Sequence, residues 1–202
     1  MSHYDPTATM EAARAQYFRD NAFGADGGYD DAWVDFKLGP VPMPFPNSKA
    51  RLRAVRYHDL HHILTGYKTD IRGELEISAW ELGAGCKDFY AAWILNLGGV
   101  GLGAWFMPRR SYRAFLRGRR SRTLYGLPFE KVLQQTVAEA RDEMGVVDEL
   151  RATSKDVALY LVTAIGGFLV GTILFWLMVP FIPVGLFMNV LRARQQRRIA
   201  KA

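Results

Sequence analysis

The sequence contains a single cysteine, Cys86, among its 202 residues. One cysteine excludes an intramolecular disulfide framework and is compatible with a reducing compartment. The N-terminus also lacks the apolar stretch that a secretory signal needs. From these two absences we expect the bulk of the protein to stay in the cytoplasm.

Charged residues are absent from Val157 to Leu191, although they make up 23% of the whole chain. The part up to Val179 is long enough to cross a bilayer, which takes about 20 apolar residues, and Pro180 and Pro183 then interrupt it. Basic residues flank both ends, which favours the cytoplasmic side for both. A shallow helical hairpin bent near Pro180 satisfies that preference, and we favour it. A single transmembrane span is the alternative.

Strand-like alternation of apolar and polar residues is weak throughout the chain, so we expect an all-α fold. Ser48 and Asp70 are good N-cap residues, Gly66 can end a helix, and Pro108 ends another. The predicted helices run from about Ser48 to Thr65, from Thr69 or Asp70 to Leu82, from about Lys87 to Phe106 and from Pro128 to Gly145.

A chain of this length can bury one sizeable core. Its first 47 residues are polar and then rich in glycine and proline, which predicts an extended arm over the surface rather than a domain. The predicted division is an extended N-terminal arm at 1–47, a helical metal-binding domain of catalytic type at 48–151, a membrane segment at 157–191 and a basic tail at 192–202.

The formal net charge is +6, and the basic residues that produce it are clustered. Beside an apolar anchor we expect them to meet anionic lipid headgroups and no nucleic acid, with a solvated basic face as the alternative. The clusters are Arg109, Arg110, Arg113, Arg117, Arg119, Arg120 and Arg122, and in the tail Arg192, Arg194, Arg197, Arg198 and Lys201.

Three of the 4 histidines lie close together, at positions 58, 61 and 62. In a helix, His58 and His62 project from one face at a spacing suited to sharing a metal ion. Asp59 brackets the same sector, which also carries apolar positions and should face the core. Burying these polar groups is costly unless a cation satisfies them.

Glu74 follows His62 at a distance over which a straight helix would turn its side chain by roughly 120°. Gly66 breaks the helix, so a second helix can fold back and aim Glu74 at the first. His58, Asp59, His62 and Glu74 then form a mixed nitrogen and oxygen set, which suits a divalent metal, with zinc as the expected ion.

Two other interpretations bear on the histidine cluster. Zinc proteases carry His-Glu-x-x-His, and here Asp59 replaces the Glu, so its shorter carboxylate is better placed to bind the metal than to act as a base. His61 points to a different sector of the helix. We interpret it as an exposed residue, with a supporting role behind the ligands or in proton handling as the alternative.

A glycine-rich run at 91–103 resembles a dinucleotide-binding loop only superficially. Gly99, Gly101 and Gly103 do not give the G-x-G-x-x-G spacing, and no acidic ribose partner follows about twenty residues later. Small residues let helices or a prenyl chain approach closely. We favour a closely packed helix that lines a lipid cavity.

The pattern His58-Asp59-x-x-His62, followed after eleven residues by Glu74, resembles that of the fourth Coq protein of ubiquinone (coenzyme Q) biosynthesis. The surrounding HDLHHILTGYKTDIRGELEISAWELG resembles that family's motif region, and LYGLPFEKVLQQTVAEARDEMGV is similar to its closing helix. The resemblance covers roughly residues 48–147. The chain differs in Leu60-His61, where the family often carries bulky aromatic residues, and in its apolar C-terminal segment.

The resemblance implies a mostly helical, often dimeric protein in which His58, Asp59, His62 and Glu74 bind zinc or a similar metal. It implies a metal-dependent lyase for the oxidative decarboxylation, at ring carbon 1, of a polyprenylated 4-hydroxybenzoate intermediate. Other quinone-biosynthesis enzymes near the membrane would be its partners. The alternative is a non-catalytic lipid-binding scaffold whose metal is structural, and action on another lipid also stays open.

Overall fold

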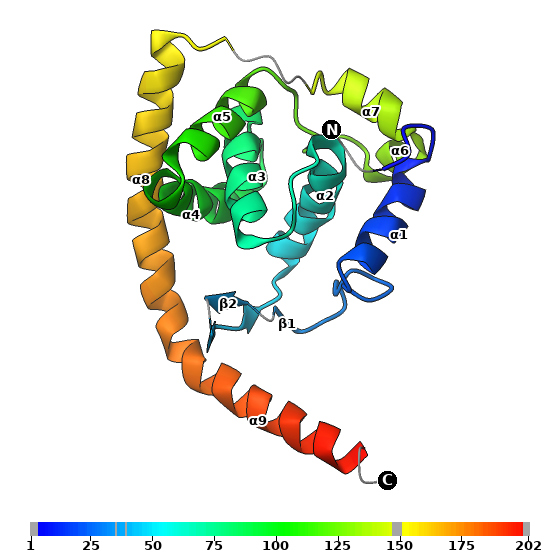
Figure 1. Ribbon diagram of the computed structural model, residues 1–202, viewed down its shortest axis with the longest axis vertical. Helices are drawn as coiled ribbons and strands as arrows, with labels where there is room; N and C mark the ends of the chain where they lie inside the picture. The colour runs from blue at the N-terminus through cyan, green and yellow to red at the C-terminus, as the bar shows by residue number, and fades with distance from the viewer. Residues whose placement is uncertain (1–3, 35, 39, 147–150, 200–202) are drawn as a thin grey trace.

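The computed structural model describes residues 4–34, 36–38, 40–146 and 151–199, and its fold is all-α, as predicted (Figure 1). In these residues the β-strands form two short antiparallel pairs, β1 (Trp33–Val34) with β4 (Phe45–Pro46) and β2 (Lys37–Leu38) with β3 (Val41–Pro42). The helices are α1 (Met10–Asp20), α2 (Lys49–Thr65), α3 (Ile71–Ala84), α4 (Tyr90–Phe106), α5 (Pro108–Arg119), α6 (Phe129–Gln134), α7 (Val137–Glu143), α8 (Ser154–Met178), the 3₁₀ turn η1 (Val179–Phe181) and α9 (Ile182–Ile199). Residues 1–3, 35 and 39 of the predicted arm, 147–150 of the predicted domain and 200–202 of the predicted tail, Lys201 among them, lie outside the described residues.

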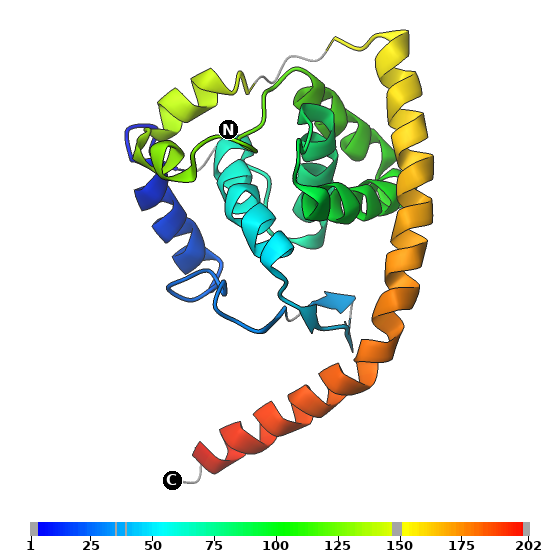
Figure 2. The ribbon, with the colours of Figure 1, turned by 180° about the vertical axis from the view of Figure 1, so that it is seen from behind.

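Helix α2 runs through the middle of the helical domain (Figures 1 and 2). Helices α1, α6 and α7 lie on one side of it, and α3, α4 and α5 lie on the other. The hydrophobic core lies where α2 packs against the two groups, and Leu60, Ile63 and Trp80 in it are completely buried. The histidine cluster is therefore carried by the central helix of the domain.

The boundaries of α2 and α3 confirm the predicted caps. The Ser48 side chain accepts a hydrogen bond from the Arg51 amide, and the Asp70 side chain accepts one from the Gly73 amide. Gly66 ends α2 with φ at 75°, a left-handed conformation that glycine adopts without steric cost. The chain changes direction between Gly66 and Asp70, as the sequence predicts.

The predicted N-terminal arm is wrong in its first part, because residues 10–20 form helix α1. Thr9 caps this helix, and its buried residues are Met10, Ala13, Tyr17 and Phe18. Their spacing is that of one helix face packed on a core. The glycine-rich stretch that follows does run as irregular chain up to the short β pairs.

The single helix predicted from Pro128 to Gly145 is also wrong, because the chain forms α6 and α7 with a break between them. Gln135 is extended, with φ −69° and ψ 151°. Thr136 starts α7 through a capping box with Glu139, in which each side chain accepts from the other residue's backbone amide. The Thr-x-x-Glu signal was present inside the apolar stripe, and the cap prevailed over the periodicity.

The apolar C-terminal segment forms α8, η1 and α9 in succession, and the chain bends at η1 without turning back (Figures 1 and 2). Helix α9 leads away from α8, so the predicted hairpin is not formed. Within the described residues, Ser154–Leu191 is the one helical stretch long and apolar enough to cross a membrane.

The glycine-rich run lies in α4 and packs against α8. A Cβ atom added to Gly101 would lie 2.4 Å from the backbone of Gly167, and one added to Gly98 would lie 3.5 Å from the Cα of Gly171. The predicted close helix packing is thus confirmed, with α8 as the neighbour. The lipid cavity stays a prediction.

Candidate metal centre

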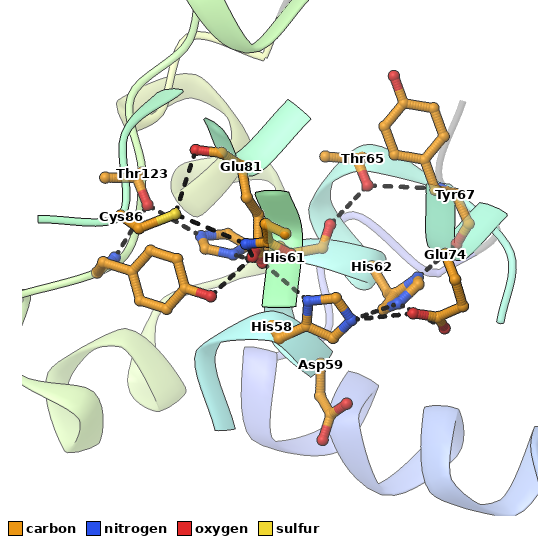
Figure 3. A network of polar contacts seen from close by, with 12 residues as sticks. His58, Asp59, His61, His62, Thr65, Tyr67, Glu74, Glu81, Cys86 and Thr123 are labelled. Atoms are coloured by element: carbon orange, nitrogen blue, oxygen red, sulfur yellow. Dashed lines mark hydrogen bonds and ion pairs between the residues drawn. The ribbon is translucent and has the colours of Figure 1, made fainter. Parts of the chain in front are cut away.

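Three of the four predicted ligands converge on one point. The Nε2 atoms of His58 and His62 lie 3.2 Å apart. The Glu74 carboxylate lies 3.3 Å from His58 Nε2 through one oxygen and 3.3 Å from His62 Nε2 through the other. One potential ligand atom from each residue falls within 4.8 Å of the others. Figure 3 shows the three side chains pointing toward one another.

Local structure explains this convergence. His58 and His62 are one turn apart on α2, so their rings share a face of the helix. Glu74 lies in the first turn of α3, directly after the reversal between Gly66 and Asp70. The chain break predicted at Gly66 is therefore what brings the carboxylate to the two imidazoles.

The hydrogen bonds behind the two rings decide which of their nitrogen atoms are free. His62 Nδ1 lies 2.9 Å from the carbonyl oxygen of Tyr67, which can only accept, so this nitrogen carries the proton. His58 Nδ1 lies 3.0 Å from a carboxylate oxygen of Glu81 and donates to it in the same way. Both Nε2 atoms therefore turn lone pairs toward each other and toward Glu74.

A site at which only acceptors converge needs a cation between them. The occupant can be a metal ion or a proton on one of the imidazoles. Two imidazole nitrogens and a carboxylate form a donor set used by zinc and other divalent metals, whose binding deprotonates the ligands. The residues present therefore fit a divalent metal, and they do not identify it.

Glu81, which the sequence analysis missed, organises the residues behind the site. Its side chain is completely buried, and the carboxylate accepts four hydrogen bonds. One oxygen accepts from His58 and from His61 Nδ1, the latter at 2.7 Å, and the other from Asn96 at 2.5 Å and from the Tyr125 hydroxyl at 2.8 Å. Glu81 thus joins α2, α3, α4 and the loop before α6.

The interpretation of His61 as an exposed helix residue is wrong, because its side chain is completely buried. Its Nε2 accepts a hydrogen bond from the Leu124 amide at 3.0 Å, which leaves Nδ1 to donate to Glu81. His61 is therefore a neutral link between Glu81 and the loop at Leu124. It stands behind the converging donors, which was the alternative interpretation.

Electrostatics agree with an anionic Glu81 and a basic His58. Burial would raise the pKa of Glu81, but the neighbouring His58 and His61 hold it well below its usual range. Burial opposes a charge on His58, yet Glu81 and Glu74 outweigh it and raise the His58 pKa well above its ordinary value. Burial would likewise raise the pKa of Glu74, and hydrogen bonds to His58 and His62 lower it to about 2.

Asp59 is the predicted ligand that the structure does not bring to the group. Its side chain points away from the other three residues (Figure 3). The Tyr29 hydroxyl donates to it at 2.5 Å and the Tyr17 hydroxyl lies 3.4 Å away, while burial raises the Asp59 pKa. Tyr17 also stacks on the His62 ring, with centroids 5.7 Å apart. Asp59 therefore ties the N-terminal region to α2.

The group is closed on one side and open on the other. The Glu81 side chain is fully enclosed, whereas the side chain of His58 is 19% exposed and that of Glu74 is 42% exposed. A metal held here by three protein donors can therefore take a further ligand from the Glu74 side, as catalytic zinc sites do.

The chain was compared with protein-family models, with curated proteins and with solved structures, and it matches none of them.

Proposed function

We propose that the protein binds a divalent metal, zinc in the first instance, through His58, His62 and Glu74 and acts in ubiquinone biosynthesis at a membrane. The reaction proposed is the oxidative decarboxylation, at ring carbon 1, of a polyprenylated 4-hydroxybenzoate intermediate. The observation that carries the metal site is the convergence of three acceptors around one point. The substrate class rests on the resemblance of the histidine motif to the ubiquinone-biosynthesis family.

The roles of the protein's own groups follow from their contacts. Glu81 and the Tyr67 carbonyl hold the Nδ1 protons of His58 and His62, so that both Nε2 atoms stay turned to the same point. The exposed side of Glu74 leaves access for a substrate. When bound, a divalent metal supplies a Lewis acid that can hold phenol and carboxylate oxygens and stabilise charge on the ring.

The proposed reaction also sets a requirement for a partner. Replacing a ring carboxylate by a hydroxyl from water releases carbon dioxide, one proton and two electrons. Zinc has no redox chemistry, so the electrons must pass to a separate two-electron acceptor. The apolar helix from Ser154 suits a prenylated substrate, because such a molecule resides in the bilayer.

A second function is favoured by the burial of Glu81. Its four hydrogen bonds connect three helices and a loop, which is the arrangement expected if the site stabilises the fold. In that case the protein is a non-catalytic lipid-binding scaffold for quinone-biosynthesis enzymes, and its metal fixes α2 to α3.

The substitution Glu74→Gln separates the two functions. In cells that lack the wild-type protein, the enzyme proposal predicts that this variant is folded and membrane-bound but yields no ubiquinone. A prenylated ring that still bears its carboxyl group should accumulate, as detected by mass spectrometry of lipid extracts. Glu76→Gln is the matched control, because Glu76 lies on the same helix but pairs with Arg110 at 2.8 Å, outside the site.

Normal ubiquinone in the Glu74→Gln cells would overturn the enzyme proposal. Loss of ubiquinone together with unfolding of the variant, while Glu76→Gln stays folded and active, would favour the scaffold.

A further inference from the structure

Helix α4 carries an exposed apolar surface that the metal centre does not use. No charged residue lies between Tyr90 and Phe106. Trp105 is 73% exposed and Phe106 is 72% exposed, values unusual for large apolar side chains of a soluble domain. The exposed apolar residues of α4 are Tyr90, Ile94, Leu95, Leu102, Trp105 and Phe106.

This surface is continuous with that of α8. Gly98 and Gly101 of α4 pack against Gly171 and Gly167 of α8 at backbone distance. The ring of Trp105 lies beside that of Phe168, with centroids 6.2 Å apart. The exposed apolar residues of α4 and α8 therefore form one continuous apolar surface.

The place of this contact restricts how α8 can sit in a bilayer. Gly167 and Gly171 lie in the middle of the charge-free stretch, and the helical domain flanks the first and middle parts of α8 (Figures 1 and 2). If α8 crossed the bilayer upright, α4 would lie at mid-depth. Both α3 and α5 pack on α4, so the exposed Arg72 of α3 and Arg113 of α5 would then approach the hydrocarbon. A charge at the bilayer centre costs at least about 2.5–3.5 kcal/mol.

An α8 lying parallel to the membrane plane avoids that cost. The apolar side of α8 that faces away from the domain then enters one leaflet, and α4 lies beside it. The charged residues of α3 and α5 then stay outside the hydrocarbon. The exposed Arg109 and Arg113 lie in the first two turns of α5, shortly after Trp105 and Phe106, which places cations and aromatic rings at headgroup level. The basic residues before and after the apolar stretch also stay on one side without a hairpin.

We infer that α8 lies in the plane of an anionic membrane surface, with α4 as a second lipid-contacting helix, so that the domain docks on one leaflet. This orientation is independent of the metal and of the proposed reaction. It places the whole helical domain at the lipid surface, instead of tethering it to a transmembrane helix.

The test uses spin labels on introduced cysteines in the full-length protein, bound to vesicles of phosphatidylcholine and phosphatidylglycerol. The only native cysteine, Cys86, is buried, so unsubstituted protein should take up little label and controls for this. Val162→Cys, Leu169→Cys and Trp176→Cys lie on the exposed side of α8, successively about 10 Å apart along it. Trp105→Cys probes α4, and Lys131→Cys on α6 is the solvent control.

The depth of each label in the bilayer is measured from its relative accessibility to oxygen and to a water-soluble nickel complex. If α8 lies in the membrane plane, the labels at 162, 169 and 176 should have the same depth within a few Å. The label at 105 should be more accessible to oxygen than to the nickel complex. The label at 131 should be more accessible to the nickel complex than to oxygen. A label at 169 about 10 Å deeper than those at 162 and 176 would show a crossing helix and overturn the inference. So would a nickel-accessible label at 105.

Discussion

At the scale of residues, the spacing of the histidines and Glu74 was sufficient to predict three converging donors. The helical repeat places His58 and His62 on one face, and the break at Gly66 returns Glu74 to them. Asp59 could not be placed by the same argument, because its partners Tyr17 and Tyr29 come from a distant part of the chain.

Glu81 was missed although the sequence held a signal for it. It lies seven residues after Glu74, so both carboxylates project from one face of α3. Its other partners, Asn96 and Tyr125, belong to later parts of the chain. Local periodicity can indicate a second inward carboxylate, but only the tertiary structure shows that four donors meet there.

Metal binding by His58, His62 and Glu74 should depend on pH. Because Glu81 and Glu74 raise the pKa of His58, a proton occupies the site when no metal is bound, and the metal must displace it. Zinc affinity should therefore rise about tenfold per pH unit up to the raised His58 pKa and then level off. Glu74, with its pKa lowered to about 2, stays ionised across this range and adds no slope.

Competition with a fluorescent zinc chelator between pH 6 and pH 8 measures this affinity, after correction for the chelator's own protonation. An affinity that does not change with pH would mean that His58 holds no proton in the metal-free protein.

At the scale of elements, helix ends were predicted well where caps are local. Ser48, Gly66 and Asp70 mark their boundaries through hydrogen bonds or backbone conformation within a few residues. The break at Gln135 was missed because the apolar stripe of α6 continues into α7. Contact with the N-terminal region supports that break, since the Met10 amide donates to the Gln135 carbonyl at 2.8 Å.

The α4–α8 contact supplies the prediction for this scale. The substitution Gly101→Ala places a Cβ atom 2.4 Å from the backbone of Gly167 and Phe168, so the two helices must separate. Overpacking of this kind costs about 1–3 kcal/mol. Urea unfolding in detergent, followed by circular dichroism, should show a loss of that size.

Gly166→Ala is the matched control, because a Cβ atom there meets nothing within 4 Å. Alanine is a better helix former, so this variant should be as stable as the wild type or up to about 1 kcal/mol more stable. Equal stability of the two variants would show that α4 and α8 are not packed at Gly101.

At the scale of the whole molecule, the sequence predicted the all-α class and the apolar C-terminal segment. It did not predict how that segment packs against the helical domain. Positive charge at both ends of Val157–Leu191 favours a hairpin over a single crossing, because a hairpin keeps both ends on one side of the membrane. The structure shows α8 running beside the domain and packed on α4. That neighbour introduces the in-plane alternative, which no local pattern could reveal.

The measurement that tests the central claim most directly is the metal content of the purified full-length protein, by mass spectrometry after zinc loading and gel filtration. We expect about one zinc per chain in the wild type and in Glu76→Gln. Glu74→Gln should bind roughly 100-fold more weakly or worse, since changing residues that only hold a ligand already costs about 10- to 100-fold. Asp59→Asn should keep its zinc, because Asp59 faces Tyr29 and Tyr17. A wild type without metal, or a Glu74→Gln variant that retains it fully, would contradict the account.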